Sequence, residues 1–322
     1  MKKKLSVFLR ITVSLGLMGF LFWIMRGKIH DVWEIIFKCN TIFLWMAIVV
    51  LLLDVIMVSF RLATVFKGEK LYMSFKRAFQ LTCVGYYFNN FMPTAVGGDI
   101  IKAHYASNVS SGDKARPYMS VFMDRFIGLY TILIISAVAL VFNGGKLKIP
   151  GLSGLVTGFV LVGVIGFIVI INRNVARKVD RFFLKFNASR FSIAINRLYR
   201  IVHDYRNRKT VVAKAFLLSF AAQCLYFLMV YLFFLALGVK ISTASIFLIM
   251  PVVLFVGMMP SLGGLGFREG AIVILFAPLA GKENAFTVSL LLLASLLLVS
   301  ILGGMIYLWW SIKGQTRERI AG

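Results

Sequence analysis

Acidic side chains stand inside long apolar stretches of this sequence, where an ionised group is costly. They are Asp54, Asp99, Asp124 and Glu269. An ionisable side chain in such a setting normally faces a cavity or a partner of opposite charge, so each of these residues is a candidate for function. Two of them have an arginine as their immediate neighbour, since Arg125 follows Asp124 and Arg268 precedes Glu269. Carboxylates and guanidinium groups in an apolar medium can bind a charged headgroup or pass a proton.

The strongest of these signals is the segment Pro260-Ser-Leu-Gly-Gly-Leu-Gly-Phe-Arg-Glu-Gly270. Its glycines, Gly263 and Gly264 among them, allow irregular backbone beside the charged pair. Arginine suits bidentate contact with phosphate, so Arg268 is the leading ligand for an anionic headgroup, with Glu269 orienting it or receiving a proton. The alternative is a structural ion pair that only closes the turn.

A second interrupted segment runs Pro93-Thr-Ala-Val-Gly-Gly-Asp-Ile-Ile-Lys102. Pro93 breaks the incoming helix, and Gly97 and Gly98 permit a tight turn with exposed amide groups. Asp99 then stands where a helix restarts, so it either caps free N–H groups or meets a substrate or proton. Lys102 either contacts a phosphate or is an ordinary charge facing the cytoplasm.

The adjacent residues Asp124 and Arg125 do not face one another on a helix, so we expect them to pair with different partners. Such residues either tie membrane helices together or contact the substrate, and both roles stay open. Asp54 is more isolated. The expected partner of Asp54 is one of Arg125 and Arg268.

The elements that position these residues are predicted to be transmembrane helices. The chain has 322 residues, of which 60% are hydrophobic and only 15% charged, and this excludes an ordinary soluble enzyme. Apolar runs long enough to approach or exceed a membrane span cover 11–25, 44–60, 121–142, 155–171, 216–237 and 288–310. The prediction is an all-α polytopic integral membrane protein, one membrane-embedded domain over residues 1–322.

Two further apolar segments, 82–104 and 245–278, are interrupted by Pro and Gly and are predicted to be re-entrant hairpins. With six full spans, the segments assigned to the cytoplasm are 1–10, 61–77, 102–116, 172–214 and 311–322. They hold 27 Lys and Arg, against 7 in the external segments. Both termini are then cytoplasmic, in the plasma membrane. The two hairpins enter from opposite sides, which suggests an inverted repeat with a site near the midplane.

The segment 172–214 carries 12 basic residues and has apolar residues at helical spacing. It is predicted to form basic amphipathic helices on an anionic cytoplasmic leaflet, or else a solvated loop that only sets topology. Nucleic-acid binding lacks any recognisable module. The Cys and His residues are scattered, so neither a metal nor another cofactor is expected.

Three motifs together resemble one known family, that of the transmembrane region of lysylphosphatidylglycerol synthase, the flippase half of the multiple peptide resistance factor. They are Pro93-Thr-Ala-Val-Gly-Gly-Asp-Ile-Ile-Lys102, Met123-Asp-Arg-Phe-Ile-Gly128 and the segment from Pro260 to Gly270. The resemblance covers the whole chain, without the soluble aminoacyl-transferase domain of the full-length factor. It implies translocation of an anionic, aminoacylated or polyprenyl-phosphate-linked lipid, with membrane lipids as partners and a lipid-modifying enzyme or glycosyltransferase as a further partner.

Two other functions remain open at this point. One is a membrane-embedded lipid-modifying transferase, such as a phosphatidylglycerol lysyltransferase, with Asp99 or Glu269 as base. The other is a membrane partner that transports nothing and recruits a cytoplasmic enzyme through 172–214. No hydrolytic constellation of residues supports an enzyme.

Overall fold

The computed structural model describes residues 16, 19, 23, 29–92, 97–107, 115–143, 151–171, 208–259, 261 and 264–321. Across these residues the chain is helical and contains no strand, as the sequence predicts. The helices are α2 (Ile29–Lys38), α3 (Thr41–Gly68), α4 (Phe75–Phe91), α5 (Gly97–Ser107), α6 (Ala115–Asn143), α7 (Leu152–Ile171), α10 (Lys209–Ala236), α11 (Thr243–Val256), α12 (Phe267–Ala280) and α13 (Lys282–Ala321).

Among the described residues, four helices are long and apolar enough to cross a membrane, namely α3, α6, α10 and α13. The apolar helix α7, with 20 residues, matches a fifth predicted span. The first predicted span, 11–25, lies largely outside the described residues, as does all of 172–214 except its last seven residues. The all-α polytopic membrane fold is therefore confirmed.

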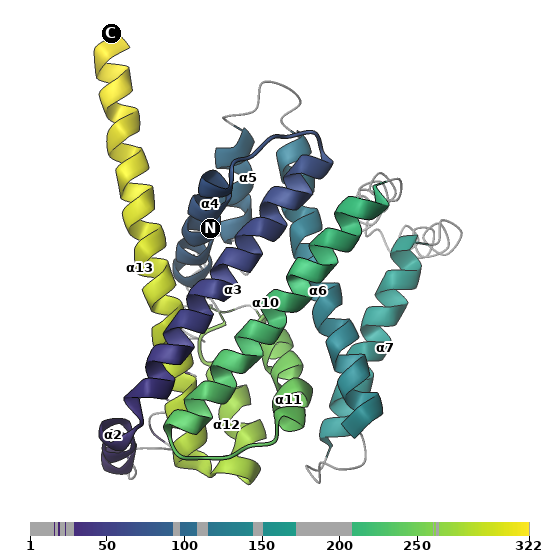
Figure 1. The fold of residues 1–322 in the computed structure, drawn as a ribbon, viewed down its shortest axis with the longest axis vertical. Helices are drawn as coiled ribbons and strands as arrows, with labels where there is room; N and C mark the ends of the chain where they lie inside the picture. The colour runs from purple at the N-terminus through teal and green to yellow at the C-terminus, as the bar shows by residue number, and fades with distance from the viewer. Residues whose placement is uncertain are drawn as a thin grey trace.

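Both interrupted segments are pairs of short helices. The first pair, α4 and α5, lies at one end of the bundle, and the second pair, α11 and α12, lies at the other end (Figure 1). Each pair spans slightly more chain than predicted, since the first runs over 75–107 and the second over 243–280. Their inner ends approach one another in the middle of the bundle.

The order of elements repeats with inverted direction. The long helix α3 is followed by the pair α4–α5 and the long helix α6, and α10 is followed by the pair α11–α12 and the long helix α13. In Figure 1, α3 rises from the lower to the upper end, whereas α10 descends. The two halves therefore run in opposite senses, which is the pattern of an inverted repeat.

Among the described helices, the packing of α3 on α10 is the most extensive contact, and α13 packs on α4 and α12. The amide of Asn40, just before α3, donates to the carbonyl of Ala236 at the end of α10 at 2.8 Å. The Asn40 side chain caps α3 by accepting from the amide of Ile42. These contacts hold the two long helices together at one end while both line the central cavity.

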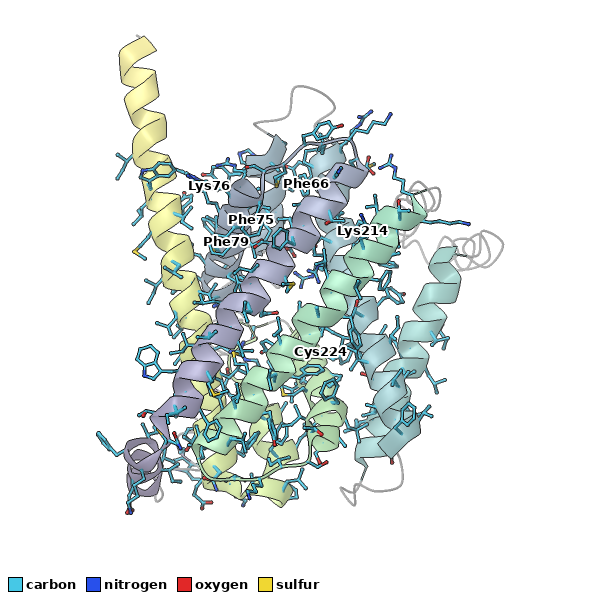
Figure 2. All side chains as sticks on the ribbon, viewed as in Figure 1. Phe66, Phe75, Lys76, Phe79, Lys214 and Cys224 are labelled. Carbon is cyan, nitrogen blue, oxygen red and sulfur yellow. The ribbon has the colours of Figure 1, made fainter. Side chains whose placement is uncertain are left out.

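Apolar side chains cover both the interior and the periphery of the bundle (Figure 2). Phe227, Met229 and Phe276 are fully buried, whereas Trp45 and Ile274 are well exposed. An all-round apolar helix is typical of a membrane span, because lipid replaces water as the outer solvent. Charged groups in the interior must therefore find partners within the bundle.

Candidate functional site

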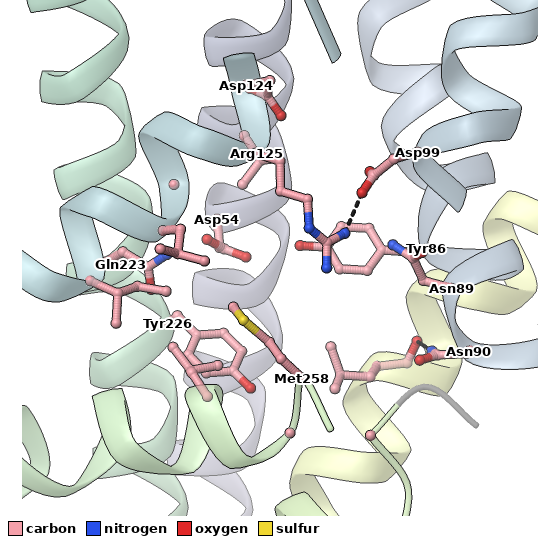
Figure 3. Close-up of a pocket in the computed structure, with 18 of the residues that line it drawn as sticks. Asp54, Tyr86, Asn89, Asn90, Asp99, Asp124, Arg125, Gln223, Tyr226 and Met258 are labelled. Atoms are coloured by element: carbon pink, nitrogen blue, oxygen red, sulfur yellow. Dashed lines mark hydrogen bonds and ion pairs between the residues drawn. The ribbon is translucent and has the colours of Figure 1, made fainter. Parts of the chain in front are cut away.

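A cavity of about 320 Å³ lies in the middle of the bundle, between the inner ends of the two broken pairs (Figure 3). Residues from α3, α4, α5, α6, α10 and the α11–α12 pair line it, together with Leu296 of α13. The charged residues in its wall are Asp54, Arg61, Asp99, Lys102, Asp124, Arg125 and Arg268. The cavity thus collects charged side chains that lie far apart in the sequence.

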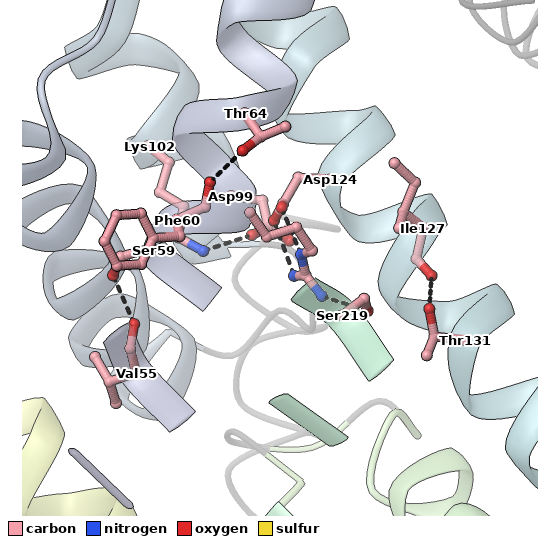
Figure 4. Close-up of polar contacts among 11 residues, drawn as sticks. Val55, Ser59, Phe60, Thr64, Asp99, Lys102, Asp124, Ile127, Thr131 and Ser219 are labelled. Carbon is pink, nitrogen blue, oxygen red and sulfur yellow. Dashed lines mark hydrogen bonds and ion pairs between the residues drawn. The ribbon is translucent and has the colours of Figure 1, made fainter. Parts of the chain in front are cut away.

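The first ion pair of the site joins α3 to α6. Arg61 donates from Nε to Asp124 Oδ1 at 2.7 Å and from Nη2 to Asp124 Oδ2 at 3.1 Å. Its remaining nitrogen, Nη1, donates to Ser219 Oγ of α10 at 2.9 Å (Figure 4). This bidentate pair is buried and fixes three helices around the cavity.

The second ion pair joins α5 to α6. Arg125 Nη1 donates to Asp99 Oδ2 (Figure 3), and Lys102 Nζ lies 3.5 Å from Asp99 Oδ1. The Arg125 side chain is one-third exposed and that of Asp99 is 12% exposed. One carboxylate therefore lies between two cations, and the group of Asp99, Lys102 and Arg125 carries one surplus positive charge. As expected, Asp124 and Arg125 pair with different partners.

The third ion pair lies where α12 begins. Arg268 donates from Nη2 to Glu269 Oε1 at 2.6 Å, and the amide of Gly266 donates to Glu269 Oε2 at 2.6 Å. Glu269 thereby caps its own helix and holds the guanidinium of Arg268, which faces the cavity. Gly264 has φ +83°, and a Cβ there would meet the carbonyl oxygen of Gly257 at 2.5 Å. Only glycine suits this turn.

Asp54 differs from the other acids of the site. It lies at the middle of the 28-residue α3, is 5% exposed and faces the cavity (Figure 3). Within the part of the chain that the structure describes, its carboxylate accepts no hydrogen bond and makes no ion pair. The partners expected for it, Arg125 and Arg268, are paired with other acids.

Neutral polar side chains complete the wall, and they are not among the residues predicted from the sequence. They are Tyr86, Asn89, Asn90, Gln223 and Tyr226. Asn89 Oδ1 accepts from the amide of Gly98 at 2.9 Å, and Asn90 donates to Ser300. The spacing of Tyr86, Asn89 and Asn90 places them on one face of α4, which is a signal that the sequence contains.

The structure brings most of the predicted site residues to this one cavity. Asp99, Lys102, Asp124, Arg125, Gly264 and Arg268 line it, and Glu269 is fully buried behind Arg268. Gly97 and Gly98 are buried in the first turn of α5, where the Gly98 amide is taken up by Asn89. Gly263 and Pro93 lie outside the described residues.

The sequence-based assignment of Arg61 to the cytoplasmic loop 61–77, as a charge that sets topology, is wrong. Arg61 is instead buried in α3, seven residues and about two helical turns after Asp54. Lys102, assigned to the cytoplasmic segment 102–116, is likewise buried in α5. Charge counts along a sequence do not separate a cation inside the bundle from one just beyond it.

Within the described residues, no three His, Cys, Asp or Glu side chains come together as a metal site. The wall instead holds the carboxylates of Asp54, Asp99 and Asp124 beside guanidinium groups, an ammonium group and neutral hydrogen-bond donors. Its arginines have the chemistry to hold an anionic group of oxygens, since Arg binds phosphate and carboxylate through parallel hydrogen bonds.

Comparison with known proteins agrees with this architecture. The sequence is 24% identical to a UPF0104 membrane protein of Pyrococcus horikoshii over 96% of this chain and 97% of that protein. It is 22% identical to a UPF0104 membrane protein of Methanothermobacter thermautotrophicus over 86% of each chain. The family described as the lysylphosphatidylglycerol synthase TM region matches residues 7–304. This chain is therefore a member of the lysylphosphatidylglycerol synthase transmembrane-region family.

Proposed function

We propose that this protein moves the anionic headgroup of a membrane lipid across the bilayer through the central cavity. The observation that carries the proposal is the meeting of two opposed broken helix pairs around a charged cavity within an otherwise apolar bundle. Broken helices at mid-depth provide free backbone groups and charged side chains where a substrate must leave water. The acyl or polyprenyl chains stay in the surrounding lipid.

The positions of Arg125 and Arg268 support an anionic headgroup. Arg125 reaches the cavity from α6 and Arg268 from the opposite hairpin. The volume of about 320 Å³ is at the lower end of the range for ligand pockets, about 300–1,000 Å³, which fits a headgroup without its chains. Asp99 and Glu269 then hold the two arginines in place rather than contact the substrate directly.

The distribution of basic residues supports an orientation with both termini in the cytoplasm of a plasma membrane. Lys67, Lys70, Arg77 and Arg208 belong to the end of the bundle where α3 ends and α10 begins. The opposite end holds fewer described basic residues, such as Lys240. Basic residues gather on the cytoplasmic side of membrane proteins. A lipid made by a cytoplasmic enzyme would enter the cavity from that side.

The test is a transfer assay in vesicles that contain the purified full chain. Phosphatidylglycerol labelled on its acyl chain is reduced from outside by an impermeant reagent, which bleaches only the outer leaflet unless the protein exchanges the leaflets. We expect bleaching well beyond half with the wild type. Arg268→Ala is expected to slow transfer about tenfold or more, because a hydrogen bond to a charged group contributes about 1.5–3 kcal/mol.

Arg208→Ala is the matched control, since Arg208 bonds Glu69 at 2.7 Å at the end of the bundle, away from the cavity. It removes the same charge and is expected to transfer lipid at the wild-type rate. Equal rates for Arg268→Ala and Arg208→Ala would contradict the site. Bleaching that stops at half for every lipid tested, with folded wild-type protein, would contradict the function, and a new covalent lipid product would point to a transferase.

A further inference from the structure

The charges around the cavity balance when every group is ionised. Of the described residues, those that line the cavity or pair with its wall include four cations and four carboxylates: Arg61, Lys102, Arg125 and Arg268, with Asp54, Asp99, Asp124 and Glu269. The stretches 92–96 and 257–266, which connect the short helices of each pair, contain no ionisable side chain. These described groups therefore sum to no net charge in that state.

An anionic headgroup brings one negative charge among these balanced groups, inside an otherwise apolar bundle. An uncompensated charge in a low-dielectric interior is costly, so binding requires either a displaced carboxylate or one added positive charge. Asp99, Asp124 and Glu269 are each tied to arginine. Asp54 is the acid that can change its charge without breaking an ion pair.

We infer that Asp54 takes up one proton when the anionic headgroup enters the cavity and releases it when the headgroup leaves, so that the lipid and the proton cross together. This inference rests on the proposed function. The proton comes from the water on the side of entry and binds a carboxylate oxygen of Asp54, and no other bond forms or breaks. With Asp54 neutral, the wall has one surplus positive charge, which the phosphate then cancels.

The surroundings of Asp54 are consistent with this role. The titratable and charged groups that face the same cavity are Arg61 on its own helix, Tyr86 on α4, Asp99 and Lys102 on α5, Asp124 and Arg125 on α6, Tyr226 on α10 and Arg268 on α12. Neither tyrosine hydroxyl has a hydrogen-bond partner within the described part of the chain. Both can therefore turn toward a bound oxyanion or toward Asp54.

The coupling of proton uptake to anion binding determines in which direction the affinity for the anion changes with pH. Because the protonated form of Asp54 binds the anion, raising the pH removes the proton and weakens binding. Once Asp54 is ionised in the empty site, uptake of one proton per anion lowers the affinity about tenfold for each further pH unit. A zwitterionic headgroup has no net charge and needs no proton, so its transfer is expected to be independent of pH.

The experiment uses the full chain in phosphatidylcholine vesicles and compares chain-labelled phosphatidylglycerol with chain-labelled phosphatidylethanolamine. Transfer rates are measured from mildly acidic to mildly alkaline pH, equal on both sides. For the wild type we expect the phosphatidylglycerol rate to fall with rising pH, approaching tenfold per unit, and the phosphatidylethanolamine rate to stay level. Asp54→Asn is expected to remove the pH dependence, and Asp54→Glu to restore it.

A flat pH profile in the wild type, or the same slope in wild type and Asp54→Asn, would overturn the inference. So would a folded Asp54→Asn protein that does not transfer phosphatidylglycerol, since the amide imitates the protonated acid. If that variant does not fold, the test uses the wild type with an acidic exterior and a neutral interior. Coupling to the proton then predicts that more than half of the labelled phosphatidylglycerol accumulates in the inner leaflet. An equal distribution between the leaflets would overturn the coupling. Absence of transfer for both lipids in the wild type would instead refute the proposed function.

Discussion

Asp54 and Arg61 lie seven residues apart on the same face of α3, yet only Arg61 has a charged partner. Arg61 is held by both oxygens of Asp124, whereas Asp54 faces the cavity without an ion pair among the described residues. One face of a single helix thus contributes a fixed charge and an unpaired charge. The fixed pair supports the architecture, and the unpaired acid is available to the substrate.

Removing Arg61 is expected to destabilise the protein strongly. Arg61→Ala leaves Asp124 buried without its partner, which costs about 3–5 kcal/mol when a buried pair is broken. The combined change Arg61→Met with Asp124→Leu should recover much of that loss, because no charge is then left unpaired. Denaturant unfolding in detergent, followed by tryptophan fluorescence, measures the free energy of unfolding, and a double variant as unstable as the single one would contradict this account.

A methyl group at Gly98 is expected to separate α5 from α4. A Cβ at Gly98 would lie 2.1 Å from the carbonyl oxygen of Gly85, a backbone atom that cannot move away without the helix. Gly98→Ala should cost about 1–3 kcal/mol of stability and slow lipid transfer. Gly270→Ala is the control, because a Cβ there meets no atom within 4 Å and Ala favours the helix by up to about 1 kcal/mol. Equal melting temperatures for both variants would refute the prediction.

Asp99→Asn is expected to slow transfer about tenfold or more while strengthening retention of anionic lipid. The change frees Arg125 and Lys102 from their shared carboxylate, so both cations hold the phosphate more tightly and release becomes slower. A tenfold change corresponds to about 1.4 kcal/mol in the barrier. Transfer rates and the amount of phosphatidylglycerol that co-purifies measure the two effects, with Asp99→Glu as the variant that keeps the charge. Faster transfer in Asp99→Asn would contradict this role.

The proposed orientation predicts from which side of the membrane an impermeant reagent labels each end of the bundle. With Cys39, Cys83 and Cys224 replaced by Ser, a cysteine at Lys70 should react with an impermeant thiol reagent only after the membrane is opened. A cysteine at Lys240 should react from outside in intact cells, because it follows α10 at the opposite end. Labelling at both sites from the same side would contradict the inverted arrangement, and the reverse pattern would invert the orientation.

Much of this fold can be read from the sequence alone. Long apolar runs predict the spans, since a helix in lipid must satisfy its backbone internally and present apolar side chains all round. Proline and glycine in two apolar segments predict the broken pairs, and the excess of basic residues predicts their opposite entry. Acidic residues in apolar surroundings identify Asp54, Asp99, Asp124 and Glu269 as functional candidates.

Only the tertiary structure decides which acidic side chain pairs with which basic side chain. Arg61 reads in the sequence as a loop charge, and its pairing with Asp124 depends on how α3 packs against α6. Asp54 pairs with neither of its expected partners. Arg125 instead binds Asp99 across a helix interface, and Arg268 binds the adjacent Glu269. Local patterns of apolar residues, proline and glycine determine where helices begin and break. Ion pairs between distant segments depend instead on how each helix is rotated and packed against its neighbours, and a single sequence contains no periodic pattern that gives this rotation.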